Sequence, residues 1–398
     1  PGLDWPSGVL LDTHMPANDE RIQTTHIGSL PRPPELLDLL TDRQDGMEID
    51  AEEWDTTVAE ATRDVVERQA EVGIDVANNG EQSRVSFNWY VADRLSGIEG
   101  TREQELWADL QEFPEYAEET FKTDVIDLSM HPVVTGPVEY TGREEAEAEI
   151  AEFQEAVDAV GADFDDTFMT AASPSVVTAT HVNEHYDSYD EYLFAVADAM
   201  AEEYELVADA GLTLQIDAPE LLTIGHTAAY ADAPLEEIKA ATSLHVQALN
   251  EALSNVPPEQ VRLHTCWGSY EGPHHLDTDL VEMLPEIYEA DITGLSIEQA
   301  NPRHQHEYRA FAEQPVPDGW TLIPGVVDVK TNVIDHPETI ADRLERVADA
   351  VDDSTPLVAA PDCGFGTQAG LGMVDPEIAW AKLAALDEGA AIAIERLS

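Results

Sequence analysis

The sequence predicts an α/β protein built as a single (β/α)₈ barrel of the TIM type. Two observations carry this prediction. Short runs rich in β-branched residues recur eight times along the chain, and most of them are followed by a stretch with helical periodicity. The chain has 398 residues, enough for one elaborated barrel. Because barrels of this type carry their chemistry at the C-terminal ends of the strands, a site is expected there.

The predicted strands all end in polar or glycine-containing segments, near residues 25–29, 79–81, 169–171, 215–217, 264–266, 296–298, 327–330 and 361–364. Apolar residues three and four positions apart, with acidic residues on the opposite face, predict helices at 51–72, 189–210, 234–253 and 376–394. The segment of about 96–160 departs from this alternation. We therefore predict an extended N-terminal arm at 1–20 and a barrel at 21–398, with an insertion of about 96–160 between strands 2 and 3.

The charge of the chain is strongly negative, with 82 acidic against 19 basic residues and a formal net charge of -63. Such a charge repels nucleic acids and anionic membranes, so neither is an expected partner. The 43% hydrophobic content argues against disorder and favours the solvated acidic shell of a halophilic protein, whose charges concentrated salt would screen. The sequence shows no apolar run of about 18 residues and no secretory leader, so a cytoplasmic location is expected. The oligomeric state stays open, a homo-oligomer included.

Four side chains of the kinds that bind zinc fall at the predicted barrel rim. His264 and Cys266 are two residues apart on one strand and so face the same side, Glu298 ends the next strand, and Cys363 ends the last. Taken alone, His264 and Cys266 are more simply a hydrogen-bonded histidine and a buried cysteine. The four together, which include both cysteines of the chain, favour Zn²⁺. A purely structural zinc is the alternative, although such sites usually use closely spaced cysteine pairs in loops.

Seven short motifs occur in order along most of the chain: TTHIGSLPRP (24–33), NGEQSR (79–84), QIDAPE (215–220), HTCWG (264–268), LSIEQAN (295–301), PGVVDVKT (324–331) and PDCGFGT (361–367). As an ordered set they resemble the cobalamin-independent methionine synthase superfamily, specifically its zinc-bearing C-terminal barrel and the shorter single-barrel relatives. Each motif is weak alone, but their order is highly specific.

The resemblance implies a Zn²⁺ held by His264, Cys266, Glu298 and Cys363 that binds a substrate thiol, with Glu298 the ligand that yields its place. A bound metal stabilises a thiolate over a thiol and so raises the fraction of nucleophile. The expected activity is that of an S-methyltransferase, which alkylates the thiol; homocysteine would give methionine.

The resemblance also implies a binding site for the amino acid part of that thiol. Ile27, Gly28 and Ser29 would hold it together with Glu81 and Asp217, the acids being suited to an ammonium group and Ser29 with backbone N–H groups to a carboxylate. The simpler alternatives are a turn or cap residue for Ser29 and a surface acid for Glu81. Asp217 lies in an apolar strand, where simple solvation explains it less well.

The chain departs from the family at Val329 and Lys330, where the methionine synthases have a histidine. Lys330 is one of four lysines and is expected either to bind an anionic group of a substrate or to donate a proton, which makes it, with Asp217, a candidate catalytic residue. Arg303 is a second candidate anion contact, although its segment is equally consistent with a cluster at a helix N-terminus.

The sequence leaves three functions open. The first is methyl transfer to homocysteine. Because the resemblance is to only one of the two barrels of the full-length synthases, a small methyl donor or a corrinoid protein is expected as an alternative to a folate donor. The second is an epoxide-opening coenzyme M transferase, since residues 80–95 and 266–275 are similar to the single-barrel relatives; Lys330 or Arg303 at the thiol would favour it. The third is a non-catalytic binding protein with a structural zinc.

Overall fold

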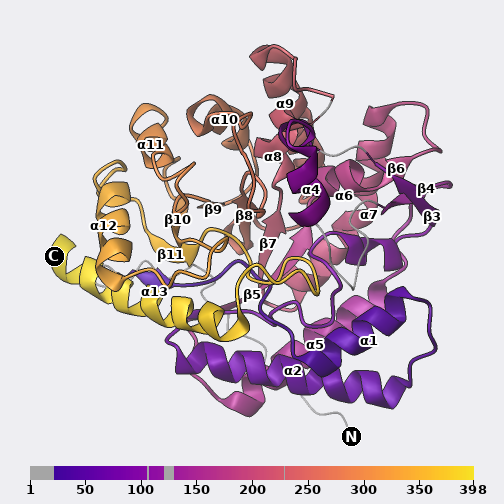
Figure 1. The fold of residues 1–398 in the computed structure, drawn as a ribbon, viewed down its shortest axis with the longest axis horizontal. Helices are drawn as coiled ribbons and strands as arrows, with labels where there is room; N and C mark the ends of the chain where they lie inside the picture. Colours follow the sequence, from indigo (N-terminus) through magenta and orange to yellow (C-terminus); the bar gives the residue numbers. More distant parts are fainter. Residues whose placement is uncertain (1–21, 105–106, 121–129, 228) are drawn as a thin grey trace, which may run out of the picture.

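Eight parallel strands form the centre of the computed structural model, which describes residues 22–104, 107–120, 130–227 and 229–398 (Figure 1). In the order of the sheet they are β1 (Gln23–Thr24), β11 (Val358–Pro361), β10 (Thr321–Val327), β9 (Gly294–Ile297), β8 (Val261–Thr265), β7 (Thr213–Asp217), β5 (Asp166–Ala172) and β2 (Val76–Ala77). Every neighbouring pair is parallel, and a parallel bridge between Thr25 and Val76 joins the two ends of the sheet. The predicted (β/α)₈ barrel is confirmed.

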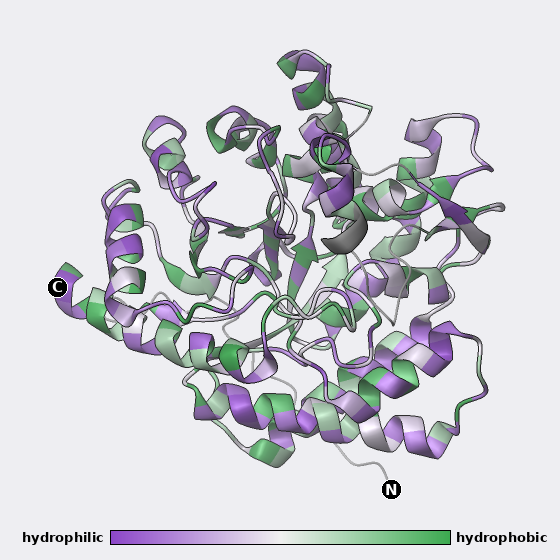
Figure 2. Ribbon diagram, viewed as in Figure 1, coloured by the Kyte–Doolittle hydropathy of each residue, from purple (hydrophilic) through white to green (hydrophobic). Residues whose placement is uncertain are grey.

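Helices surround the strands, and each predicted helix is found with small differences at its ends. The longer ones are α1 (Pro34–Gln44), α2 (Ala51–Glu71), α5 (Arg143–Val160), α7 (Tyr189–Asp209), α9 (Leu235–Ala252), α10 (Leu280–Ile287), α12 (Pro337–Ala348) and α13 (Pro376–Leu397). The shorter ones are α6 (Pro174–Thr180), α8 (Glu220–Thr223), α11 (Ala310–Glu313), and the 3₁₀ turns η1 (Trp89–Asp93), η2 (Ile224–His226), η3 (Pro258–Gln260) and η4 (Glu307–Arg309). In Figure 2 the long helices are striped with hydrophobic and hydrophilic residues, as expected for helices that cover a core on one side.

Side-chain caps fix the starts of two of the predicted helices. The Asp50 carboxylate accepts the backbone N–H groups of Glu52 and Glu53 at the start of α2. Asp375 does the same for Glu377 at the start of α13, where Pro376 occupies the first turn. A capping carboxylate satisfies N–H groups that have no partner within the helix, so each cap fixes the residue at which the helix begins.

The segment between β2 and β5 adds a small sheet to the barrel. It contains β3 (Ile98–Glu103) and β4 (Met130–Val134), which are antiparallel, and the short helices α3 (Ala108–Gln111) and α4 (Pro114–Thr120). The third strand, β6 (Val182–Asn183), follows α6 and pairs with β4. Helix α5 packs against α2 and α7, as a helix of the barrel layer does, so the C-terminal part of the predicted 96–160 insertion is regular barrel structure. The predicted arm at 1–20 lies outside the described residues.

A buried network of ion pairs ties this segment to the barrel. Glu149 of α5 binds Arg84 at 2.8 Å and Arg94 at 2.5 Å, and Arg94 also binds Glu203 of α7 at 2.9 Å. Burial would raise the pKa of Glu149, but the charges of Arg84 and Arg94 lower it to about 2. Glu149 also accepts a hydrogen bond from Asn79. The network therefore anchors the loop after β2, at the C-terminal rim of the barrel.

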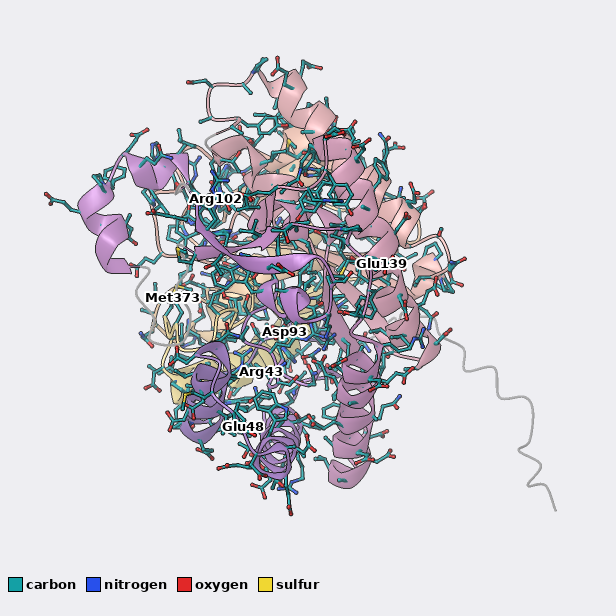
Figure 3. All side chains as sticks on the ribbon, turned by 90° about the vertical axis from the view of Figure 1, so that its right-hand side faces the viewer. Arg43, Glu48, Asp93, Arg102, Glu139 and Met373 are labelled. Carbon is teal, nitrogen blue, oxygen red and sulfur yellow. The ribbon has the colours of Figure 1, made fainter. Side chains whose placement is uncertain are left out.

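The surface is acidic over the described part of the chain. Figure 3 shows carboxylate side chains projecting from one face, including the exposed Glu48, Asp93 and Glu139. Arg43 pairs with Asp93 at 3.3 Å on the same face. Among the described residues, no helix has both the length and the apolar character that crossing a bilayer requires.

Candidate active site

Three of the four predicted metal ligands meet at the barrel rim. His264 and Cys266, at the end of β8, and Cys363, just after β11, bring their ligand atoms within 4.8 Å of one another, and all three residues are buried. Both cysteines are free thiols. The Nδ1 atom of His264 lies 3.2 Å from the Ser296 hydroxyl, and its Nε2 atom has no hydrogen-bond partner among the described residues. Two sulfurs and an imidazole with an uncommitted nitrogen are a donor set that fits Zn²⁺.

The two thiols differ in their electrostatic environment. A hydrogen bond from Cys266, helped by the contact with His264, lowers the pKa of Cys363, while the same sulfur–sulfur contact and burial raise the pKa of Cys266. Within this pair the thiolate form is therefore easier to reach at Cys363 than at Cys266, and a divalent cation would favour the thiolate form of both.

Glu298 lies beside this group and is not a member of it. Its Oε1 atom accepts hydrogen bonds from Lys330 and, at 2.5 Å, from Asn301, and its Oε2 atom accepts the backbone N–H of Trp267 at 3.1 Å. Burial would raise the pKa of Glu298, but the charge of Lys330 holds it below its usual value. Burial would lower the pKa of Lys330, but the negative charge of Glu298 has the larger effect and raises it. The carboxylate and the ammonium group thus form a buried ion pair at the edge of the candidate metal site.

Glu81 and Asp217 form a second cluster on the rim. Asp217 ends β7 and accepts a hydrogen bond from Gln215 at 2.7 Å, while Glu81 accepts one from Thr170 at 2.9 Å and leaves its Oε2 atom without a partner in the described structure. Burial raises the pKa of both acids, and the charges of Glu81 and Cys363 raise that of Asp217 further. A cation placed between the two carboxyl groups would relieve this repulsion, so the pair is suited to an ammonium group.

The backbone around Glu81 is unusual. Glu81 has φ 54°, a left-handed conformation that residues other than glycine rarely adopt and that concentrates at functional sites. Gly28, with φ 115°, lies so close that an added Cβ would come within 2.6 Å of the Glu81 Oε1 atom. The absence of a side chain at residue 28 is therefore needed for the loop after β1 to approach Glu81.

The remaining residues of the predicted amino acid site lie in the same loop. A Cβ on Gly364 would collide with the Ser29 hydroxyl, so Ser29 touches the segment that carries Cys363. Ile27 packs its side chain inside the barrel with Ile323 and directs its carbonyl to Gln215 at 2.9 Å. Residues 27–29 thus connect the carboxylate pair with the cysteine cluster.

Arg303 is the predicted site residue that the structure does not bring to the rim cluster. Its side chain is exposed, and its backbone N–H donates to Asn301 at 3.0 Å. In the described part of the chain, no hydrogen bond or ion pair joins its guanidinium group to another predicted site residue.

Known proteins resemble this chain over most of its length. A family model described as the catalytic domain of cobalamin-independent synthase matches residues 22–375, a range that includes all eight barrel strands and every residue of the rim clusters. The chain belongs to this synthase family. Two relatives are methionine synthases: one from Thermococcus kodakarensis is 23% identical over 378 residues, with 95% of each chain covered, and one from Saccharolobus solfataricus is 24% identical over 381 residues, with 94% of this chain and 96% of the relative covered.

Solved structures in the synthase family agree in fold. A B12-independent methionine synthase from Shewanella sp. W3-18-1, in complex with selenomethionine, superposes with a TM-score of 0.67 at 20% identity and covers 95% of this chain and 99% of its own. A putative vitamin-B12 independent methionine synthase from Listeria monocytogenes gives a TM-score of 0.64 at 21% identity, with the same coverage. At these identities the likeness shows the barrel architecture.

Sequence reasoning missed the residues that support this synthase site. Ser296 contacts His264, and its position two residues before Glu298 on β9 would place both on one face by strand alternation. Asp362 accepts the backbone N–H groups of Gln299, Ala300 and Asn301 at 2.7–3.0 Å and so holds the loop after β9 in place. The signal for Asp362 was its position directly before Cys363, but bonds to a loop 61–63 residues away could not be read from it.

A further polar cluster supports the loop after β8. The Asp277 carboxylate lies 2.7 Å from His226, 3.0 Å from His274 and 2.9 Å from His304. The His304 ring stacks on Trp267 with 3.7 Å between centroids and 4° between planes. Because Trp267 follows Cys266, this cluster fixes the main chain next to the cysteine.

The inserted segment reaches the same loop. Asp109 of α3 accepts the Tyr270 hydroxyl at 2.6 Å and the backbone N–H of His274 at 3.2 Å. The Trp107 ring lies 4.6 Å from the Tyr270 ring. The insertion therefore covers the loop that follows the candidate metal ligands.

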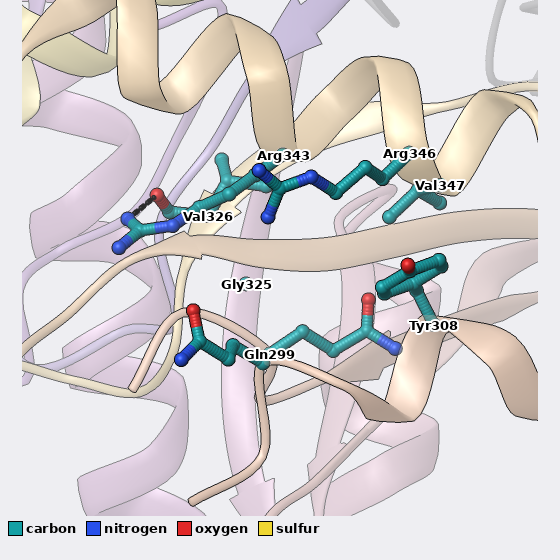
Figure 4. A pocket seen from close by; sticks show the side chains of 8 residues that line it. Gln299, Tyr308, Gly325, Val326, Arg343, Arg346 and Val347 are labelled. Carbon is teal, nitrogen blue, oxygen red and sulfur yellow. Dashed lines mark hydrogen bonds between the residues drawn. The ribbon is translucent and has the colours of Figure 1, made fainter. Parts of the chain in front are cut away.

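A small cavity lies outside the barrel wall, between β10 and α12 (Figure 4). Its volume of about 10 Å³ has room for about one water molecule. Gln299 lines it with both side-chain amide atoms lacking a protein partner in the described residues, and Arg343 lies on the opposite side. This cavity is separate from the rim clusters, and a water molecule in it would satisfy Gln299.

We predict that the cluster of Asp277 and its three histidines makes a pH-dependent contribution to stability. Hydrogen bonds from His226, His274 and His304 outweigh burial and hold the pKa of Asp277 well below its usual range; for His304, the bond to Asp277 outweighs burial and raises the pKa. A raised histidine pKa contributes stability that is fully present below its unfolded value, about 6.5, and is lost as the pH rises through the folded value. Asp277→Asn is therefore expected to destabilise the protein by roughly 1 kcal/mol more at pH 6 than at pH 9.

Urea unfolding of the wild type and Asp277→Asn at the two pH values measures this difference. Asp198, exposed on α7, provides the control Asp198→Asn, which should change stability little at either pH. An equal loss at pH 6 and pH 9 for Asp277→Asn would show that the charge of His304 does not contribute.

Proposed function

We propose that this protein transfers a methyl group to the thiol of homocysteine to give methionine, with Zn²⁺ as its cofactor. The observation that carries the proposal is the proximity of two sites on one rim: the thiol-binding donor set of His264, Cys266 and Cys363, and the carboxylate pair of Glu81 and Asp217. Homocysteine has a thiol and an ammonium group and so matches both. Membership in the synthase family and the two methionine synthase relatives support the same conclusion.

The amino acid part of homocysteine would be held by the chain's own groups. Glu81 and Asp217 would receive the ammonium group, and Gln215 keeps Asp217 oriented. Ser29 and the main chain of residues 27–29 would receive the carboxylate, as they lie between the acids and Cys363. The Shewanella synthase, whose structure contains selenomethionine, supports an amino acid with a soft chalcogen as the ligand of this fold.

The metal would be held by His264, Cys266 and Cys363, with Glu298 as the fourth ligand. When bound, Zn²⁺ stabilises a thiolate and supplies a nucleophile at neutral pH. Ser296 holds the His264 ring, and the buried surroundings exclude water that would weaken these charges. Lys330 is paired with Glu298, which supports a role in placing that carboxylate rather than in proton donation.

Coenzyme M is a less suitable thiol for these residues. Its sulfonate needs a cation at the site, whereas Lys330 is already neutralised by Glu298 and Arg303 is exposed outside the cluster.

The site adjoins the insertion through the loop after β8, and the donor, whether a folate, a small methyl compound or a corrinoid protein, would have to approach past this covering segment.

An assay of the zinc-loaded protein in molar salt tests the proposal. Homocysteine and coenzyme M would each be incubated with methyltetrahydrofolate, methylcobalamin and an epoxide, and thioethers identified by mass spectrometry. We expect methionine from homocysteine and a methyl donor. A thioether formed only from coenzyme M would replace homocysteine as the substrate, and the absence of any thioether would contradict an alkyltransferase and favour a binding protein.

The carboxylate pair gives a prediction about substrate binding. Asp217→Asn and Glu81→Gln are each expected to raise the KM for homocysteine roughly 10- to 100-fold, since a hydrogen bond to a charged group contributes about 1.5–3 kcal/mol. Binding of 4-mercaptobutyrate, which lacks the ammonium group, should be weak in the wild type and little affected by either change. Glu388→Gln, at an exposed position on α13, is the matched control. Equal effects on both thiols would mean that the acids do not recognise an ammonium group.

A further inference from the structure

The ion pair between Glu298 and Lys330 has a consequence for the metal site that rests on the proposed function. We propose that Lys330, Asn301 and the backbone N–H of Trp267 form a resting site for the Glu298 carboxylate, which competes with the metal for this ligand. That Glu298 yields its place is already implied by the resemblance to the synthase family, and the new role is that of Lys330, which positions the carboxylate when it is off the metal.

The resting site satisfies Glu298 completely. The side chain is 0% exposed, and both of its oxygen atoms are bonded: Oε1 by Lys330 and Asn301, and Oε2 by the N–H of Trp267. A buried carboxylate without partners would be strongly destabilising. The departure of Glu298 from a metal is therefore favourable only where such a set of donors is available.

The donors are themselves held rigidly. Asp362 binds the side chain and the N–H of Asn301 at 3.2 and 3.0 Å, and the indole of Trp267 donates to the Thr278 carbonyl at 2.8 Å while its ring stacks on His304. The main chain of Lys330 is fixed by Asp328 at 3.2 Å. A preorganised site can accept the carboxylate without further ordering of the protein.

The resting site also lies next to the ligands. The N–H that Glu298 accepts belongs to Trp267, which directly follows Cys266 in the chain. The carboxylate in its resting position is therefore bonded to the main chain directly beside a cysteine of the cluster.

The charges favour the same exchange. Two cysteine thiolates and Glu298 would together carry three negative charges against the two positive charges of the metal. A substrate thiolate brings one more negative charge, and the Glu298 carboxylate, on leaving, is neutralised by Lys330. Without the ammonium group of Lys330, the released Glu298 carboxylate would remain buried and unpaired beside an anionic cluster.

Zinc affinity without substrate tests the competition directly. Lys330→Met removes the charge while keeping the length of the side chain, so the free protein loses the ion pair and Glu298 becomes more available. We expect Lys330→Met to bind zinc about 10-fold more tightly in a chelator competition, one tenfold step per roughly 1.4 kcal/mol. Lys239→Met, on α9, removes a surface lysine and should leave the affinity unchanged.

A double variant distinguishes an effect exerted through Glu298 from a general disturbance of the fold. In a Glu298→Gln background the buried charge is absent, so adding Lys330→Met should leave zinc affinity unchanged if Lys330 acts through Glu298. Equal or weaker zinc binding by Lys330→Met, or the same effect of Lys330→Met in both backgrounds, would overturn the proposal.

The visible spectrum of the cobalt-substituted protein tests the substrate side. Homocysteine should bind to the wild type with a spectral change that marks sulfur addition, and at least 10-fold more weakly to Lys330→Met. Unchanged homocysteine affinity in Lys330→Met would contradict the resting site. A wild type with no spectral response would instead contradict the proposed function and leave the zinc-affinity result to decide the competition.

Discussion

Cys363→Ser is expected to lower the affinity for zinc by more than about 100-fold and to abolish methionine formation. Residues that only support a metal ligand cost up to about 100-fold when removed, so the loss of a ligand should cost more. Cys363 is the member of the rim group whose thiol pKa is lowered, by the hydrogen bond from Cys266 and the contact with His264, and a serine hydroxyl would not ionise there.

Zinc content after equilibration with a chelator measures this loss. Thr265→Ser is the matched control, because Thr265 lies between His264 and Cys266 and bonds the Ala218 carbonyl at 2.9 Å, which serine can preserve. If Cys363→Ser retained one zinc per chain with wild-type affinity, Cys363 would not be a ligand.

Glu149→Gln is expected to lower the free energy of unfolding by about 3–5 kcal/mol, the usual cost of breaking a buried ion pair by removing one partner. The change removes the carboxylate that pairs with Arg84 and with Arg94. Because both arginines are buried, water does not replace the lost partner. Since Asn79 also binds Glu149, the loop that carries Glu81 should be loosened and homocysteine binding weakened.

Denaturant unfolding in molar salt checks this prediction. The exposed pair of Arg68 and Glu377, at 3.0 Å, supplies the control Glu377→Gln, for which at most about 1 kcal/mol is expected. A loss for Glu149→Gln no larger than that of the control would mean that solvent reaches the network.

The barrel could be predicted because its pattern is local. Each strand is a short apolar run with polar residues at its end. Helices such as α2 show apolar periodicity and begin directly after a capping residue, here Asp50. The boundary of the insertion could not be predicted in the same way. Helix α5 begins with a run of glutamate and alanine that is equally consistent with a surface excursion, and only its packing on α2 and α7 places it in the barrel layer.

The candidate site was predictable to a different degree for each residue. Strand alternation places His264 and Cys266 on one face, and the structure brings Cys363 to them. Alternation does not apply in loops, so the exposed position of Arg303 had no signal in the sequence. The pairing of Glu298 with Lys330 joins two strand ends 32 residues apart, and only the barrel geometry brings them together.

Zinc K-edge X-ray absorption of the zinc-loaded protein, with and without homocysteine, measures most directly whether the substrate thiol binds at the cysteine cluster. The free protein should show the two sulfur ligands of Cys266 and Cys363, and saturating homocysteine should raise the number to three, while coenzyme M should leave it at two. A sulfur count that stays at two with homocysteine would contradict thiol activation by a metal at this site.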